Sequence, residues 1–115
     1  MSMHAQTIVK ANVAVDSGIA RLVAALNEFP EVQTLDSCQG EAGVFDAYVY
    51  LKCADWKTTC EFLFGRLAPA MKDEIDGETL KIEVFGNEDP VGKLTFPTGS
   101  IDELTVLIQR MNQRP

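Results

Sequence analysis

The sequence predicts an α+β fold in which helices cover one face of an antiparallel sheet, a two-layer sandwich with the element order βαββαββα. Five segments have the composition or the two-residue alternation of strands, and three carry apolar residues at helical spacing. Gly, Pro, Asn and Asp separate neighbouring strand segments, which is typical of hairpins. The first six elements also match a split βαβ, or ferredoxin-like, core with an appended strand and helix.

One domain over residues 1–115 is expected, because a chain of 115 residues fits a single hydrophobic core. Domains of this size bury about 65% of the surface that the unfolded chain exposes. A hydrophobic content of 46% is ordinary for a globular domain, so we expect an ordered fold.

The first strand and helix are expected over residues 7–15 and 19–29. Small apolar residues recur at every second position of the strand. Asp16 or Ser17 can cap the helix by accepting a hydrogen bond from its first backbone N–H groups. Pro30 ends it, because the residue before a proline is disfavoured in helical conformation. The apolar stripe of this helix is Ile19, Leu22, Val23, Leu26 and Phe29.

A hairpin is expected from residues 31–36 and 44–53, joined by a loop over residues 37–43. Apolar patterning favours a register in which Thr34 lies beside Ala47. That register places Asp36 on the inner face of the sheet, next to the loop. Tyr48 and Tyr50 lie on the opposite face, which is left to a partner, to the third helix or to water.

A second helix is expected after Asp55, which can cap it. Its predicted core stripe includes Trp56 and Cys60, and Pro69 should kink or break it near Ala68. Strands over residues 79–85 and 91–96 follow, with a turn over residues 86–90. The other residues in the core stripe of the second helix are Leu63, Phe64, Leu67 and Met71. The last helix carries Ile101, Leu104, Leu107, Ile108 and Met111 on its apolar side.

Composition limits the classes of partner. The net charge is −7, with 17 acidic and 10 basic residues and no run of basic ones, so we do not expect nucleic acid to bind. Three cysteines and one histidine, His4, in no ligand-like spacing predict neither a metal site nor a cofactor. No leader and no apolar run of membrane length are visible, so we expect a cytoplasmic protein with reduced thiols and no membrane partner.

The polar segment at the loop is the candidate binding site. It places a thiol, a hydroxyl and an amide beside a flexible glycine, and rigid strands that present a polar loop often build a site. The same residue types are also ordinary in turns. The candidate binding residues are Asp36, Ser37, Cys38, Gln39, Gly40, Glu41, Tyr48 and Tyr50.

Three functional classes stay open. As a recognition module, the chain would bind a small polar ligand or a protein partner through the loop, with Tyr48 or Tyr50 as an aromatic wall. As an enzyme it would use Cys38 as a nucleophile, but the neighbouring carboxylates raise a thiol pKa, so no catalytic residue is assigned. As a structural protein it would form a homodimer or larger homo-oligomer through an exposed face or edge of the sheet.

Three segments of the chain are similar to segments of known protein families. They are Asp16-Ser17-Gly18-Ile19, Thr34-Leu35-Asp36-Ser37-Cys38-Gln39-Gly40 and Ala47-Tyr48-Val49. Over residues 12–52 the chain resembles a group of small bacterial and phage proteins with a T-x-x-S-C-x-G loop and no assigned activity. More distantly, Ser37-Cys38-Gln39-Gly40 is similar to the S-C-x-G loop of the wybutosine-synthesising tRNA methyltransferases, which implies an activity related to tRNA modification. That family places a basic residue after the glycine, where this chain has Glu41.

Overall fold

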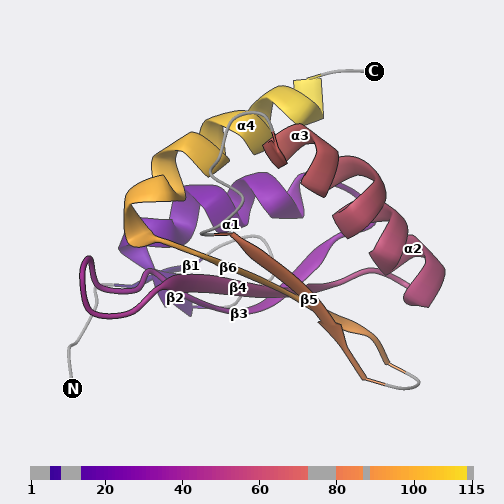
Figure 1. The fold of residues 1–115 in the computed structure, drawn as a ribbon, viewed down its shortest axis with the longest axis horizontal. Coiled ribbons are helices and arrows are strands. Elements are labelled where there is room, and N and C mark those ends of the chain that lie inside the picture. Colours follow the sequence, from indigo (N-terminus) through magenta and orange to yellow (C-terminus); the bar gives the residue numbers. More distant parts are fainter. Residues whose placement is uncertain (1–5, 9–13, 73–79, 87–88, 114–115) are drawn as a thin grey trace.

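The structure is a computed structural model that describes residues 6–8, 14–72, 80–86 and 89–113. Helices lie on one side of a four-stranded antiparallel sheet, and a separate two-stranded sheet lies near the N-terminus (Figure 1). The predicted α+β sandwich is therefore confirmed. The radius of gyration of 13.3 Å is the value expected for one domain of this length.

The predicted first strand is two short strands, β1 (Gln6–Ile8) and β2 (Ala14–Asp16), that pair with each other. A period-two pattern is the same for one long strand and for two paired short ones, so the alternation could not reveal the division. Neither strand belongs to the four-stranded sheet. The ferredoxin-like arrangement, which needs the first strand inside that sheet, is therefore wrong for the described strands.

The four-stranded sheet has the order β3-β4-β6-β5, and each neighbouring pair is antiparallel. It consists of two hairpins joined through their second strands. The first hairpin contains β3 (Gln33–Cys38) and β4 (Ala47–Lys52), and the second contains β5 (Lys81–Phe85) and β6 (Val91–Phe96).

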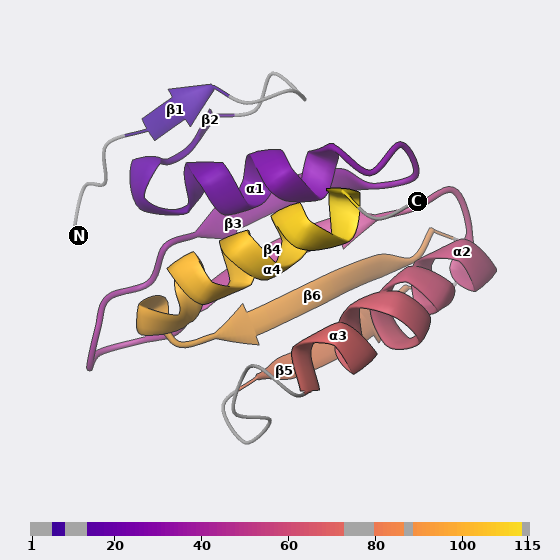
Figure 2. The same ribbon diagram turned by 90° about the horizontal axis from the view of Figure 1, so that it is seen from above.

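The helices pack on one face of this sheet, as the sequence predicted. The 3₁₀ turn η1 (Ser17–Ile19) leads into α1 (Ala20–Asn27), and η3 (Thr98–Ser100) leads into α4 (Ile101–Gln113). Figure 2 shows α1 and α4 side by side over the sheet, with the third helical segment along the β5 side. The fully buried side chains of the inner face are Ala47, Val49, Leu51, Leu94 and Phe96, packed against Ile19, Leu22, Leu26, Leu104 and Ile108.

The middle helical segment runs through Pro69 without the expected break. It consists of α2 (Trp56–Cys60), the π-helical η2 (Glu61–Leu67) and α3 (Ala68–Lys72). The N–H of Ala68 donates to the carbonyl of Leu63, five residues back. Such wide turns accommodate a residue that lacks an N–H and that crowds the preceding turn. The cap was predicted correctly, since Asp55 Oδ1 accepts a hydrogen bond of 2.7 Å from the N–H of Thr58.

The π turns also change which side chains face the core. Trp56 and Phe64, both expected inside, are 38% and 48% exposed, and Cys60 is half-buried. Because each π turn takes one residue more than an α turn, the stripe shifts in phase along the helix. Phe62 replaces Phe64 in the core, so the buried set is Phe62, Leu63, Leu67 and Met71.

Candidate functional site

The first hairpin has a different register from the one expected. Asp36 lies opposite Tyr50 and Cys38 opposite Tyr48, and the pairing shifts between Thr34 and Asp36. This shift marks a β-bulge, in which one extra residue reverses the faces of those that follow. Thr34 pairs with Leu51 rather than Ala47, and the connection spans residues 39–46 rather than 37–43. Asp36 is therefore exposed on the helix-free side of the sheet and not on its inner face.

Ser37 points to the other side of the sheet from its neighbours in the chain. It pairs with Val49, whose side chain is fully buried on the helix-covered face. The Ser37 Oγ atom is itself buried and has no hydrogen-bond partner among the described residues. Buried hydroxyl groups are usually hydrogen-bonded. Because Ser37 pairs with Val49 and points to the helix-covered face, it does not share a surface with Asp36 and Cys38.

Gln39 fastens the connection to two distant parts of the chain. Its backbone N–H donates to Asp16 Oδ2 at 3.1 Å, and its Oε1 accepts from the N–H of Gly18 at 2.9 Å. Its carbonyl accepts from the Thr98 hydroxyl at 2.8 Å. These bonds join the hairpin to the start of η1 and to η3, which leads into α4. Gln39, a candidate for ligand binding in the sequence, has its side-chain oxygen and both of its backbone polar groups engaged within the protein.

Gly40 is required at its position by space as well as by conformation. Its φ is +70°, in the left-handed region that favours glycine. A Cβ there would lie 2.5 Å from Thr98 Oγ1 and 2.6 Å from the backbone nitrogen of Ala47. The N–H of Gly40 donates to Cys38 Sγ at 3.5 Å. Gly40, which the sequence suggested as a flexible residue, is thus closely packed, and together with Gln39 it forms an anchor that holds the start of the connection against the rest of the fold.

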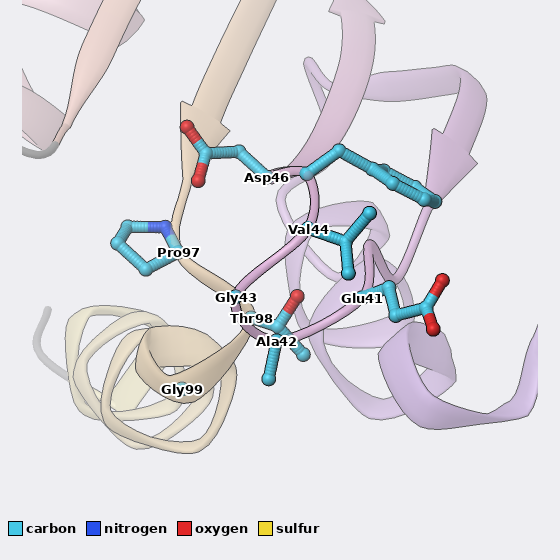
Figure 3. Close-up of a pocket in the computed structure, with 9 residues that line it drawn as sticks. Glu41, Ala42, Gly43, Val44, Asp46, Pro97, Thr98 and Gly99 are labelled. Atoms are coloured by element: carbon cyan, nitrogen blue, oxygen red, sulfur yellow. The ribbon is translucent and has the colours of Figure 1, made fainter.

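The second half of the connection, residues 41–46, projects from the molecule. The N–H of Glu41 donates to the Phe45 carbonyl at 2.9 Å, which closes a small turn. Val44 and Phe45 are 70% and 46% exposed, and Glu41 is exposed too. A cavity of about 230 Å³ lies between this tip and the residues that open η3 (Figure 3). Its lining residues are Glu41, Ala42, Gly43, Val44, Phe45, Asp46, Pro97, Thr98 and Gly99.

The cavity holds no convergent set of polar groups. The carboxylates of Glu41 and Asp46 point away from one another in Figure 3. Ligand sites usually combine an apolar lining with a few polar groups that converge on the ligand. The tip and its cavity therefore provide weaker support for a site than the helix-free side of the sheet does.

That helix-free side, which we call the open face, combines residues from all four strands. Alternation and register place one row across the sheet as Asp36, Tyr50, Lys93 and Glu83. The neighbouring row is Cys38, Tyr48, Thr95 and Lys81. The structure therefore unites four of the eight predicted site residues, Asp36, Cys38, Tyr48 and Tyr50, and adds Lys93 and Thr95 from β6.

Lys93 occupies the centre of the open face. Its Nζ lies 5.3 Å from the ring centroid of Tyr48 and 5.2 Å from that of Tyr50. The two rings pack edge to face with centroids 5.5 Å apart. In the described part of the chain no carboxylate lies within ion-pair distance of Lys93. Its ammonium is held by aromatic faces and keeps its charge available to a ligand.

The sequence could not identify Lys93 as a site residue, although a partial signal was present. The alternation of residues 91–96 places Lys93 and Thr95 on the same side of one strand. Without the strand order, nothing linked that side to the tyrosines. The pairing of β4 with β6, which places Lys93 opposite Tyr50, supplies the link.

Burial raises the pKa of Tyr48 above its ordinary value of 10.0, and the negative charge of Asp36 raises it further, with smaller effects of Cys38, Tyr50 and Asp16. The Tyr48 phenol therefore stays protonated through the neutral pH range. It can donate a hydrogen bond to an acceptor that approaches Lys93.

The open face also differs in charge from the rest of the molecule. It carries Lys52, Lys81 and Lys93 with the carboxylates of Asp36 and Glu83, and Lys52 Nζ lies 3.9 Å from Asp89 Oδ2. With Asp89 included, three basic residues meet three acidic ones there, and the remaining sequence has seven basic and fourteen acidic residues. The surface that carries the paired tyrosines is thus close to neutral, whereas the rest of the chain is acidic, so a ligand anion is repelled less there.

Chemistry beyond binding has little support in the described part of the chain. The Sγ atom of Cys38 receives a hydrogen bond from the N–H of Gly40, and no side chain that could act as a base bonds to it there. No three His, Cys, Asp or Glu side chains of the described residues cluster as metal ligands, and His4 lies outside those residues. Cys38, Cys53 and Cys60 are free thiols. Within the described ranges, no helix has the length and apolarity needed to cross a membrane.

Comparison with known proteins gives no match, since neither a family model, nor a curated protein, nor a solved structure is significantly similar to the chain. The resemblance of the segment 37–40 to the S-C-x-G loop of the tRNA methyltransferases, and of residues 12–52 to the small bacterial and phage proteins, stays a prediction.

Proposed function

We propose that this protein is a recognition module whose open face binds a small polar ligand carrying an anionic group. The observation that supports the proposal most strongly is the position of Lys93 over the rings of both Tyr48 and Tyr50. An ammonium held in this way presents a fixed positive charge at the centre of a flat, partly aromatic surface. Hydrogen bonds to a charged group contribute about 1.5–3 kcal/mol, enough to select for an anion.

The groups around Lys93 fit the same ligand class. The Tyr48 hydroxyl is a donor on one side, and Thr95 offers a hydroxyl in the adjacent row. Asp36, opposite Tyr50 on β3, offers an acceptor for an N–H or O–H group of the ligand. The tyrosine rings provide apolar area for a flat part of the ligand. A planar molecule with a carboxylate at one end matches these groups.

The supporting geometry favours recognition over catalysis. Binding through Lys93 and the tyrosines needs no activated nucleophile, and Cys38 is hydrogen-bonded by the backbone N–H of Gly40. The alternative of an enzyme that uses Cys38, or that takes part in tRNA modification, requires a base or a cation beside the thiol. Three free thiols are consistent with a cytoplasmic module in a reducing compartment.

A titration with benzoate tests the proposal, because benzoate joins a flat ring to a carboxylate and benzamide is its neutral counterpart. We expect benzoate to bind measurably more tightly than benzamide. Lys93→Gln should weaken benzoate binding by about tenfold or more, the loss expected when a charge-assisted hydrogen bond is removed. Lys57→Gln, which removes an exposed lysine of α2, is the matched control and should leave binding unchanged.

The proposal is wrong if Lys93→Gln binds benzoate as tightly as the unaltered protein does. Equal binding of benzoate and benzamide would also contradict it, since the charge of the ligand would then contribute nothing.

A further inference from the structure

The two edges of the four-stranded sheet are different. At one edge, β3 contains the bulge between Thr34 and Asp36, and Gln39 at its end is bonded to Asp16 of β2. At the other edge, β5 pairs with β6 in an unbroken register from Lys81 to Phe85. No described strand pairs with the outer side of β5, which is the last strand in the order of this sheet. Regular unpaired edges are templates for pairing with another chain.

The side chains of β5 alternate in a way that suits self-pairing. Lys81 and Glu83 are exposed on the open face, two positions apart and opposite in charge. Ile82 and Val84 lie on the helix-covered side and are only half-buried, although they pack against the core. The strand therefore offers a charged row and an apolar row along the same free edge.

We infer that β5 pairs antiparallel with β5 of a second copy of this chain, with a two-fold axis at Ile82. In this register Ile82 faces the second copy's Ile82, and Leu80 faces Val84. Lys81 then lies opposite Glu83 of the other chain twice, once on each side of the axis. Cross-strand pairs of opposite charge stabilise an antiparallel sheet, and like charges directly opposite destabilise it.

The other symmetric registers are less favourable. An axis at Lys81 or at Glu83 would bring two like charges together, and the axis at Glu83 would also place Lys81 opposite Phe85. An axis at Val84 would place Glu83 opposite Phe85, so neither charge of the strand would find a counter-charge. The alternation of Lys81 and Glu83 around Ile82 therefore selects one pairing.

The resulting dimer has one continuous eight-stranded sheet with the two open faces side by side. Strand pairing alone buries less area than a stable interface needs. The helical segment that runs along the β5 side (Figure 2) carries exposed Trp56 and Phe64, and β5 itself ends in exposed Phe85. Trp56 and Phe64 add exposed apolar area on the helical layer, and Phe85 adds it at the end of the strand on the open face.

The first experiment measures molecular mass against protein concentration by sedimentation. We expect the mass to rise from monomer to dimer as concentration rises. Lys81→Glu replaces both attractive pairs with like charges and should weaken dimerisation at least about fivefold. The double variant Lys81→Glu/Glu83→Lys restores opposite charges across the interface and should regain dimerisation. A monomer at every concentration, or a double variant as weak as the single one, overturns the inference.

The second experiment tests the register by cross-linking. Ile82→Cys places a thiol directly opposite its copy, within the distance that a disulfide needs. Val84→Cys, one residue pair further along the same row, places the two thiols roughly 13 Å apart along the strands. Under mild oxidation, Ile82→Cys should form a disulfide-linked dimer, and Val84→Cys should not. Peptide mapping separates this disulfide from any at Cys38, Cys53 or Cys60. Equal cross-linking at both positions, or at neither, contradicts the proposed axis.

Discussion

The two hairpins of the sheet are built in opposite ways. The β3–β4 hairpin contains a bulge, a long connection over residues 39–46 and an anchor at Gln39 that reaches both η1 and η3. The β5–β6 hairpin has an uninterrupted register and an outer edge with which no described strand pairs. Polar residues of the first hairpin thus hold the fold together, and the strongest candidate binding groups lie where the two hairpins meet, on β4 and β6. The polar, glycine-containing segment over residues 37–41 suggested a binding site in the sequence, but such a segment can equally well serve to hold the fold together.

Gly40→Ala should cause the largest loss of stability in the first hairpin. A Cβ in left-handed conformation costs about 1–2 kcal/mol, and overpacking against backbone atoms costs about 1–3 kcal/mol more. Here the Cβ would meet Thr98 Oγ1 and the Ala47 nitrogen. Denaturant unfolding should therefore show a loss of about 2–5 kcal/mol.

Gly43→Ala is the matched control, because Gly43 has a φ of +77° and a Cβ there would meet no described atom within 4 Å. It should lose only the conformational part, about 1–2 kcal/mol. Equal losses for the two variants would show that the first half of the connection is no more tightly packed than its tip.

Gln39→Ala should have the next largest effect. It removes the bond between Oε1 and the N–H of Gly18, and it leaves the two bonds of the Gln39 backbone in place. A loss of about 1–2 kcal/mol in the free energy of unfolding is expected. Gln33→Ala changes an exposed residue at the start of β3, the strand that precedes Gln39, and should stay within about 0.5 kcal/mol of the unaltered protein. Two indistinguishable variants would mean that Gln39 is not an anchor.

Much of the fold was predictable because periodicity records burial. The stripe of α1, the cap at Asp55, the strands over residues 81–85 and 91–96 and the outward face of Tyr48 and Tyr50 all follow from alternation or helical spacing. The bulge in β3 and the π turns of η2 could not be predicted, because each adds one residue that shifts the phase of the pattern. Those shifts account for the wrong positions of Asp36, Trp56 and Phe64.

The site was predictable only in part, for a related reason. Tyr48 and Tyr50 could be recognised from their own strand, but Lys93 joins them through a pairing between distant segments. The sequence also could not show that Gln39 and Gly40 serve the fold, since their bonds reach Asp16, Gly18 and Thr98. Long-range contacts of this kind leave no local pattern.

Ser37→Ala should change the free energy of unfolding less than Gln39→Ala does, and in the opposite direction. Because Ser37 Oγ is buried without a described hydrogen-bond partner, its removal avoids a desolvation cost of about 1 kcal/mol or more. The lost packing of one small atom partly offsets this gain. Thermal unfolding should show a stability equal to that of the unaltered protein or higher by up to about 1 kcal/mol. A loss above 1 kcal/mol would show that the hydroxyl is bonded in solution.

The smallest expected effect is a pH dependence at the open face. The folded-state pKa of Tyr48 is raised, so the folded protein holds its proton at pH values where the unfolded chain loses it. Stability should therefore fall as the pH rises above about 10. In a Tyr50→Phe background, phenolate absorbance should show Tyr48 titrating above 10.0. Asp36→Asn should lower that pKa only in part, because burial is the larger cause. A Tyr48 pKa below 10.0 would contradict the described environment.

The most direct test of the open face as the binding surface is a benzoate titration followed by amide chemical shifts in the ¹⁵N-labelled protein. We expect the largest shifts at residues 36–38, 48–50 and 93–95, the three strand segments that surround Lys93. The tip and its cavity, residues 41–46 and 97–99, should move little. The largest shifts at the tip, with residues 93–95 unchanged, would contradict the proposal and return the site to the loop.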